Sequence, residues 1–183
     1  MKGFTLVEVL IVLVILVLVT GVIYAGYVLS QRAYIQGEIS AELTQNARVV
    51  LERMTREIRQ AREVVTDLPS SAEEALNHIE FEDGHGSDRY YYIRYFQADN
   101  ELKREMVAYY FSGDDTVFVP RNAIPPPGES LEEALIEEAR TIGEFVKELK
   151  VWSPETKIIN IFINLEKGGK ELDFSTSVSG RNL

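Results

Sequence analysis

The sequence predicts an α+β protein, in which one long N-terminal helix, half transmembrane and half amphipathic, packs on a domain of antiparallel β-sheet. Two observations predict this class. No proline occurs before Pro69, and an apolar run there is followed by apolar residues at helical spacing. Beyond Pro69, apolar and polar residues alternate in short segments separated by turn sequences. A helix followed by a series of strands is the element order of an α+β fold.

Composition limits the size and chemistry of the chain. Its 183 residues, 45% of them hydrophobic, suffice for a membrane segment and one modest domain. The absence of cysteine excludes disulfides, thiolate metal sites and cysteine catalysis. Of the net charge of −10, residues 1–65 contribute +1, which leaves −11 for residues 66–183. Because an acidic surface repels polyanions, nucleic acid is an unlikely partner for the domain.

The first helical segment is long enough to cross a membrane. Val9 to Leu29 is a run of 21 uncharged residues, and a helix rises about 1.5 Å per residue, which matches a hydrocarbon core about 30 Å thick. A secretory signal peptide has a shorter apolar region of about 7 to 15 residues. We therefore expect residues 4–29 to form a transmembrane helix.

Glu8 places a carboxylate inside this apolar segment. A charged side chain deep in hydrocarbon costs about 2.5 to 3.5 kcal/mol on insertion scales, so an ionisable residue there indicates a function and requires a partner. The alternative is a simple membrane anchor whose glutamate lies near the lipid headgroups. The residues around Glu8 favour the functional interpretation.

The string Lys2-Gly3-Phe4-Thr5-Leu6-Val7-Glu8, followed by aliphatic residues, closely resembles the N-terminal signature of type IV prepilins and type II secretion pseudopilins. This resemblance implies a pilin-like fold and a leader of residues 1–3. It implies that prepilin peptidase cleaves after Gly3, that the amine of Phe4 is then methylated, and that Glu8 acts in assembly. It further implies a single-pass protein of the bacterial inner membrane with a periplasmic domain. Its partners would be other pilin subunits, prepilin peptidase and the inner-membrane assembly platform.

Elementary electrostatics agrees with this role for Glu8. After cleavage, the amine of Phe4 would be a cation at a helix N-terminus, where the helix dipole is also positive. Glu8 of a neighbouring subunit would supply the missing anion in a packed filament. Such pairing offsets part of the cost of removing both charges from water.

Residues 30–65 are predicted to continue the helix as an amphipathic segment. Apolar residues at steps of three and four form one stripe for packing on the sheet: Ile35, Ile39, Leu43, Ala47, Val50, Met54, Ile58, Ala61 and Val65. Arginines gather on an adjoining face. They form either a solvated face or a contact with acidic surfaces of neighbouring subunits.

Residues 66–183 are predicted to form the extracytoplasmic α+β domain. Capping patterns favour two helices there, from Ser70 or Ser71 to about Asn77 and from Leu131 to Ile142. Alternation favours seven strands: His78 to Glu82, Arg89 to Gln97, Leu102 to Ser112, Thr116 to Val119, Phe145 to Trp152, Ile158 to Leu165, and Leu172 to Ser179.

Parts of this domain look like minor members of the family, the J-type pseudopilins and PilW-like minor pilins. The similar parts are Phe81, the strand from Tyr90 to Phe96, Leu102 to Glu105, and the ending from Phe174 to Asn182. This resemblance implies a minor subunit that acts in a tip or initiation complex.

Little in the chain suggests catalysis or a cofactor. The two histidines lie in no recognisable constellation, and sequence motifs for a zinc protease, a phosphate loop or a nucleophile elbow are absent. The segment containing Asp83 and Asp88 is a weak calcium candidate, because oxygen-rich residues suit hard cations, although turns favour the same residues. The tyrosines from Tyr90 to Tyr95 suggest either ligand stacking or, more simply, two faces of a sheet.

We therefore expect a non-enzymatic structural subunit of a type IV pilus or type II secretion pseudopilus. A protein of another class remains as the alternative. It is an envelope binding domain that is permanently held by a single membrane span and is not assembled into a filament.

Overall fold

A computed structural model describes residues 5–85, 90–155 and 157–180 of the chain. The chain divides into two compact units, residues 1–41 and residues 42–183. Helix α1 (Leu6–Gln60) begins in the first unit and ends in the second, where antiparallel sheets accompany it. The predicted α+β, pilin-like layout, with one long apolar N-terminal helix and an antiparallel sheet domain, is confirmed.

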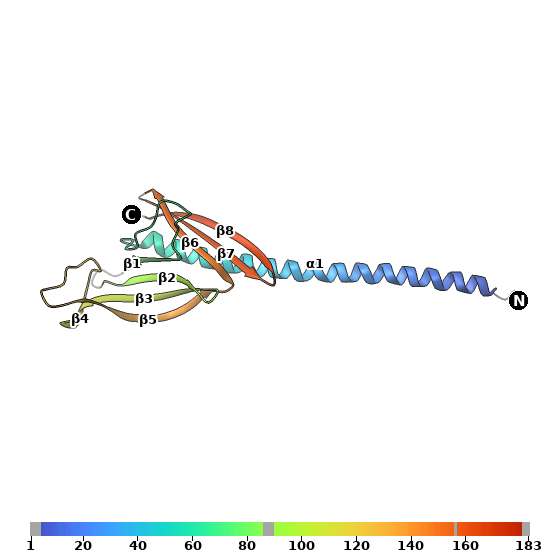
Figure 1. Cartoon of the computed structure of the whole chain (residues 1–183), viewed down its shortest axis with the longest axis horizontal. Helices are drawn as coiled ribbons and strands as arrows, with labels where there is room; N and C mark the ends of the chain where they lie inside the picture. Colours follow the sequence, from blue (N-terminus) through green and yellow to red (C-terminus); the bar gives the residue numbers. More distant parts are fainter. Residues whose placement is uncertain (1–4, 86–89, 156, 181–183) are drawn as a thin grey trace. The chain divides into compact units, whose positions relative to one another are not determined.

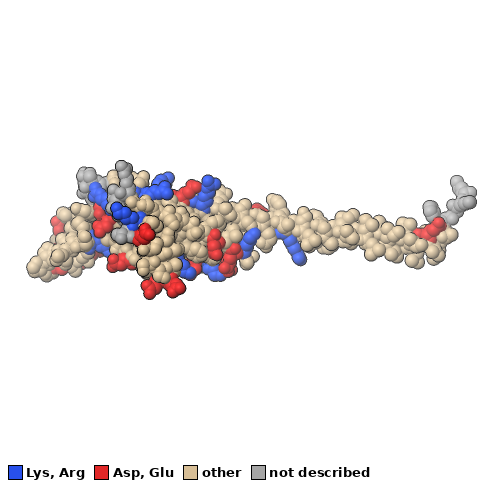
Figure 2. Space-filling model, turned by 90° about the horizontal axis from the view of Figure 1, so that it is seen from above, with Lys and Arg blue, Asp and Glu red and all other residues tan. Residues whose placement is uncertain are grey.

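The first unit consists of the N-terminal part of α1. Its aliphatic side chains are exposed in the isolated chain, as at Leu10 (56%) and Leu18 (63%). An 18-residue window of this helix has a mean hydropathy of 3.2, so by length and composition α1 can cross a membrane. In Figure 2 this part of the helix is almost entirely tan, the colour of uncharged residues, while the blue and red charged side chains gather on the second unit.

The second unit contains two antiparallel sheets, with the end of α1 beside them (Figure 1). The larger sheet has the order β1-β2-β3-β4, with β5 also paired to β3. Its strands are β1 (His78–Glu82), β2 (Tyr92–Ala98), β3 (Glu101–Phe111), β4 (Asp114–Val119) and β5 (Leu131–Gly143). The smaller sheet has the order β6-β7-β8. Its strands are β6 (Val146–Glu155), β7 (Ile158–Lys167) and β8 (Lys170–Ser179).

The core of this unit lies where the apolar stripe of α1 meets the sheets. The buried stripe residues recur at helical spacing: Leu43, Ala47, Val50, Met54 and Ile58. The sheets contribute fully buried side chains that include Phe81, Tyr95 and Ile161. Phe81 and Tyr95 stack with their ring centroids 6.1 Å apart. Burial of these large side chains supplies the main stabilisation of the unit.

The helix ends at Gln60, five residues before the predicted end at Val65. The following segment instead runs beside β1, where the amide of Val65 donates to the carbonyl of Glu80 at 3.0 Å. The amide of Glu82 donates to the carbonyl of Glu63 at 2.8 Å. Pairing with the edge of β1 therefore replaces the last helical turn.

The helix predicted from Ser70 or Ser71 to Asn77 is wrong. This segment forms turns, and the amide of Glu73 donates to the Ser71 hydroxyl at 3.1 Å within one of them. Leu76 exchanges two backbone hydrogen bonds with Val151 of β6, at 3.0 and 2.8 Å. The capping residues therefore stabilise a turn, and the following residues pair with a strand.

The helix predicted over Leu131 to Ile142 is also wrong, because this segment is strand β5. The strand pairs with β3 from Leu131 opposite Phe111 to Gly143 opposite Leu102. Three register shifts interrupt this pairing between Leu102 and Val107 of β3. The backbone hydrogen bonds offered by β3 outweigh the intrinsic helix preference of Leu, Glu and Ala.

The seven predicted strands occur, six of them with shifted ends. His78 to Glu82 has the predicted boundaries, while β2 begins at Tyr92 rather than at Arg89, which lies outside the described residues. Two of the connections are tight turns with positive φ, at Asp99 and Asn100 and at Gly168 and Gly169. Such turns match the right-handed twist of a two-stranded hairpin.

Candidate functional site

The candidate site lies at the start of α1, around Glu8. Thr5 donates two hydrogen bonds to Oε2 of Glu8, from its amide at 2.9 Å and from its hydroxyl at 3.0 Å. The amide of Glu8 donates to the Thr5 hydroxyl at 3.3 Å. This reciprocal pattern is a capping box, which satisfies backbone donors at a helix N-terminus. Thr5 thus fixes the position of the Glu8 carboxylate.

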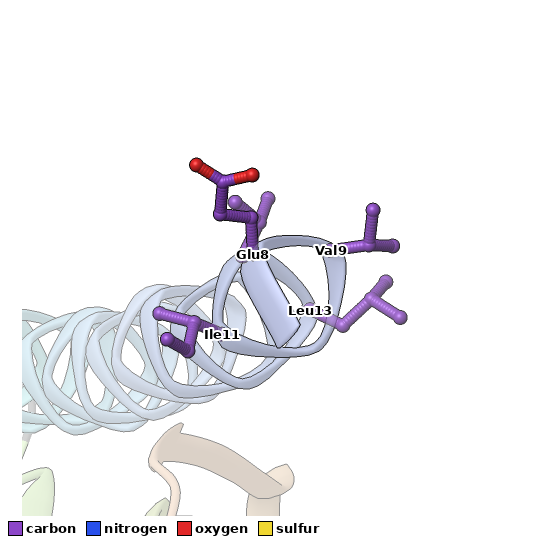
Figure 3. A pocket seen from close by; sticks show the side chains of 5 residues that line it. Glu8, Val9, Ile11 and Leu13 are labelled. Carbon is purple, nitrogen blue, oxygen red and sulfur yellow. The ribbon is translucent and has the colours of Figure 1, made fainter. Parts of the chain in front are cut away.

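The carboxylate of Glu8 projects outward from the helix, as Figure 3 shows. The neighbouring side chains are apolar: Val9, Ile11, Val12 and Leu13. Thr5 is an uncharged donor and engages one carboxylate oxygen, so the charge of Glu8 is held in place but not neutralised. An external cation that approaches along this apolar surface would find the carboxylate already oriented.

Thr5 is a partner of Glu8 that sequence reasoning missed. The signal was present, since threonine followed three residues later by glutamate is the sequence pattern of a capping box. Gly3 and Phe4, the predicted processing residues, lie outside the described residues.

The predicted packing residues of the helix fall into two groups. Leu43, Val50, Met54 and Ile58 are fully buried. Ile35 is 50% exposed and Ile39 is half-buried, and both belong to the first unit. The four buried residues are therefore the ones placed in the core of residues 42–183.

A second group of functional side chains ties α1 to the larger sheet. Glu57 accepts hydrogen bonds from the hydroxyl of Tyr95 at 2.6 Å and from Nε of Arg104 at 3.0 Å. Burial alone would raise the pKa of Glu57, but the hydrogen bonds from Tyr95 and Arg104 outweigh burial and lower it. The same contact and burial raise the pKa of Tyr95. Glu57 is therefore an ionised anchor between helix and sheet.

A third cluster surrounds Glu80, which is only 3% exposed. Its carboxylate contacts Arg94 at 2.8 Å and Arg121 at 3.2 Å, and it accepts a hydrogen bond from the Tyr109 hydroxyl at 2.8 Å. Arg94 also contacts Glu105 and Glu133. The sequence did not predict this cluster. Its residues come from different strands, and the sequence pattern of one strand does not show how that strand pairs with its neighbours.

The calcium candidate has only one member among the described residues. Asp83 accepts hydrogen bonds from the backbone of His85 at 3.2 Å and lies 2.6 Å from its ring Nδ1, while Asp88 lies outside the described residues. Within residues 5–85, 90–155 and 157–180, no group of three or more histidine, aspartate or glutamate side chains is arranged to hold a metal. Asp83 acts here as the acceptor of a local turn.

Comparison with known proteins gives a match at the N-terminus. Residues 1–24 match the family model described as the prokaryotic N-terminal methylation motif. No curated protein and no solved structure matches the chain. The motif supports a prepilin-type protein, a type IV pilin-like substrate of prepilin peptidase, and together with the apolar helix it fits a membrane-anchored chain.

Proposed function

We propose that this chain is a minor pilin or pseudopilin, a structural subunit of a bacterial type IV pilus or type II secretion pseudopilus. One observation supports the proposal: residues 1–24 match the methylation motif, and in this segment the expected processing site at Gly3 and Phe4 comes four to five residues before the carboxylate of Glu8 in an apolar helix. The chain would act in assembly of a tip or initiation complex, and it would have no enzymatic activity.

The proposed organisation follows the order of the chain. Residues 1–3 are the leader, residues 4–29 the transmembrane and assembly helix, residues 30–65 its amphipathic continuation, and residues 66–183 the periplasmic domain. Before assembly the protein would reside in the inner membrane as a single-pass subunit. Its partners would be other pilin subunits, prepilin peptidase and the assembly platform.

In this role, Glu8 receives the methylated amine of Phe4 from a neighbouring subunit. The Thr5 cap supports this step, because it orients the carboxylate without cancelling its charge. Burying the pair away from water strengthens the attraction between its members. A lone Glu8 inside a helical bundle would instead be an uncompensated charge, which strongly disfavours packing.

Analysis of the mature N-terminus tests the processing step. In cells with active prepilin peptidase, mass spectrometry of the membrane-extracted chain should find it beginning at methylated Phe4. In cells that lack the peptidase, the same chain should retain residues 1–3. Retention of residues 1–3 in both strains would contradict the proposal and favour the alternative, a permanently anchored envelope binding domain.

Substitution at Glu8 tests the assembly step. Glu8→Ala should leave membrane insertion intact and reduce recovery of the chain in sheared filaments or in purified minor-subunit complexes. Glu38→Ala is the matched control, since Glu38 is an exposed glutamate of the same helix outside the span. Thr5→Val removes the cap but keeps the carboxylate. Equal losses in Thr5→Val and Glu8→Ala would show that capping, and not pairing, is the role of Glu8.

A further inference from the structure

A groove lies between α1 and strand β8 within residues 42–183. Its volume is about 340 Å³. Leu51 of the helix and Phe174 of the strand are both half-buried and give the groove an apolar part. The other lining residues are polar: Thr44, Arg48, Glu52, Thr55, Ser175 and Thr176. The groove therefore offers a mixed surface directly beside a strand.

Strand β8 is an open edge of its sheet. It pairs with β7 along all ten residues without a register shift, and among the described residues no second strand pairs with its other edge. The stretch from Phe174 to Ser179 contains neither charge nor proline. Proteins usually protect exposed edges with bulges, charges or proline, so a regular and neutral edge is a template for another strand.

Strand β5 is the edge of the larger sheet. Within the described residues it pairs only with β3, and from Leu131 to Leu135 this pairing is regular. Leu135 is 57% exposed. The register shifts lie beyond this stretch, toward Gly143. Leu131 to Leu135 is thus a straight, partly apolar segment whose second edge is open.

The two edges run in opposite directions along the helix. Strand β5 ends at Gly143, and the carbonyl of the next residue, Glu144, accepts a hydrogen bond from Asn46. Strand β8 begins at Lys170, opposite Lys167, whose ammonium contacts Glu42 at the start of the unit. Two copies side by side in the same direction would therefore present β5 antiparallel to β8. Pairing β8 with β8 would instead set the two helix segments antiparallel.

A cation beside the groove and a carboxylate on β5 have opposite charges. Arg59, in the last turn of α1, is exposed and forms no ion pair among the residues that the structure describes. It lies one turn beyond Thr55, on the groove side of the helix. Glu132 of β5 accepts a hydrogen bond from the Tyr110 hydroxyl but contacts no cation in the described part of the chain. In the antiparallel arrangement, Glu132 would lie toward the Gln60 end of the helix, the end that carries Arg59.

We propose that strand β5 of a second copy of this chain adds antiparallel to the open edge of β8 and places Leu131 to Leu135 over the α1–β8 groove. The contact joins two different surfaces, so one copy keeps a free β5 edge and the other keeps a free β8 edge. Such a contact joins unlike surfaces and does not close on itself. It lies wholly within residues 42–183 and does not depend on processing at Gly3 and Phe4.

Disulfide cross-linking tests the contact in the full-length chain in membranes, because the native sequence has no cysteine. One tagged copy carries Ser175→Cys, on the exposed face of β8. The second copy carries a single cysteine at one position from Leu131 to Leu135. Because successive strand side chains point to opposite faces, cross-link yield should rise and fall with every second position.

In the control experiment, the first copy carries Glu155→Cys in place of Ser175→Cys. Glu155 is exposed on β6, at the opposite edge of the smaller sheet, so this variant should give no alternating pattern of cross-link yield. Charge exchange supplies a test that does not alter the core. Arg59→Glu in the Ser175→Cys copy should lower the yield about two- to fivefold, and Glu132→Arg in the other copy should restore it.

Several results would overturn the proposal. They are equal yields at all five positions, a yield with Glu155→Cys that equals the yield with Ser175→Cys, and a Ser175→Cys chain that cross-links mainly to itself. Cross-linking to a different subunit but never to a second copy would overturn it as well. An unprocessed chain that still shows the alternating pattern would support the contact even if the proposed function fails.

Discussion

The hydroxyl of Tyr95 in β2 donates a 2.6 Å hydrogen bond to Glu57 of α1, and the two side chains join helix and sheet across the core. Tyr95 is fully buried. Arg104 and Arg53 bind the same carboxylate, at 3.0 and 3.2 Å. The helix is therefore attached to the larger sheet by a charge-assisted network as well as by apolar packing.

Tyr95→Phe should lower the free energy of unfolding by about 1 to 3 kcal/mol, because it removes a hydrogen bond to a charged group and keeps the ring. Urea unfolding of the detergent-solubilised chain, followed by fluorescence of Trp152, measures this change. Trp152 is the single tryptophan of the sequence and is half-buried in β6.

Tyr110→Phe is the matched control for Tyr95→Phe. Its hydroxyl also donates to a glutamate, Glu132, at 3.0 Å, but the residues are at the surface. Water can replace the lost hydrogen bond at the surface. The free energy of unfolding of Tyr110→Phe should therefore differ from that of the native chain by only a few tenths of a kcal/mol, about the scale of other surface changes. Equal losses in the two variants would show that the buried contact has no special role.

Acid should destabilise residues 42–183 through Glu57 and Glu133. Hydrogen bonds and charge from Arg94 lower the pKa of Glu133, and the bonds from Tyr95 and Arg104 outweigh burial to lower the pKa of Glu57. Lowered pKa values in the folded state mean that this stabilisation is present above the unfolded value of 4.5. It is lost as pH falls below that value through the folded pKa.

Urea midpoints measured between about pH 7 and about pH 3 should therefore decline, and Glu57→Gln should make the decline shallower. The difference between the native chain and Glu57→Gln should be largest near neutral pH and should shrink in acid. A constant difference across this range would contradict a lowered pKa for Glu57.

Gly143 lies where β5 approaches the helix, and a Cβ added there would be 2.5 Å from Cγ2 of Val50. Gly143→Ala should therefore destabilise the chain by about 1 to 3 kcal/mol through overpacking. Val50→Ala alone creates space and is also destabilising. If the clash with Val50 causes the destabilisation, the Gly143→Ala, Val50→Ala double variant should lose less free energy of unfolding than the sum of the two single losses. Strictly additive losses would exclude the clash as the cause.

The sequence allowed prediction of elements whose pattern agrees with their final environment. His78 to Glu82 forms the strand that its alternation predicted, although four of its five residues are buried. The stripe from Leu43 to Ile58 supplies the buried residues of α1. Strand β5 was not predictable in this way. Its composition favours a helix, and its conformation depends on pairing with β3, which a local pattern does not reveal.

Polar contacts between residues close in the sequence could likewise be predicted, whereas contacts between distant residues could not. The Thr5 and Glu8 cap involves two residues three positions apart, so the sequence contains its full signal. The contact between Glu57 and Tyr95 spans 38 positions, and it exists only because helix and sheet pack in one register. The glutamate and tyrosine patterns alone gave no reason to pair these residues.

The guanidinium of Arg94 contacts three carboxylates: Glu80 at 2.8 Å, Glu105 at 2.8 Å and Glu133 at 2.7 Å. Arg94→Leu leaves the buried Glu80 with Arg121 as its remaining cation, at 3.2 Å. Removing one partner of a buried ion pair costs about 3 to 5 kcal/mol, since the other charge stays desolvated. We therefore expect a large loss in the free energy of unfolding, again measured by urea unfolding.

Two further variants separate charge from packing at this position. Glu105→Gln removes one acceptor from Arg94 and leaves the contact with Glu80 in place, so it should cost less than Arg94→Leu. Glu80→Gln combined with Arg94→Leu removes both the buried charge and its main partner, and it should recover part of the loss. If the double variant is no more stable than Arg94→Leu alone, then lost packing of the arginine stem, rather than the unpaired carboxylate, causes the destabilisation.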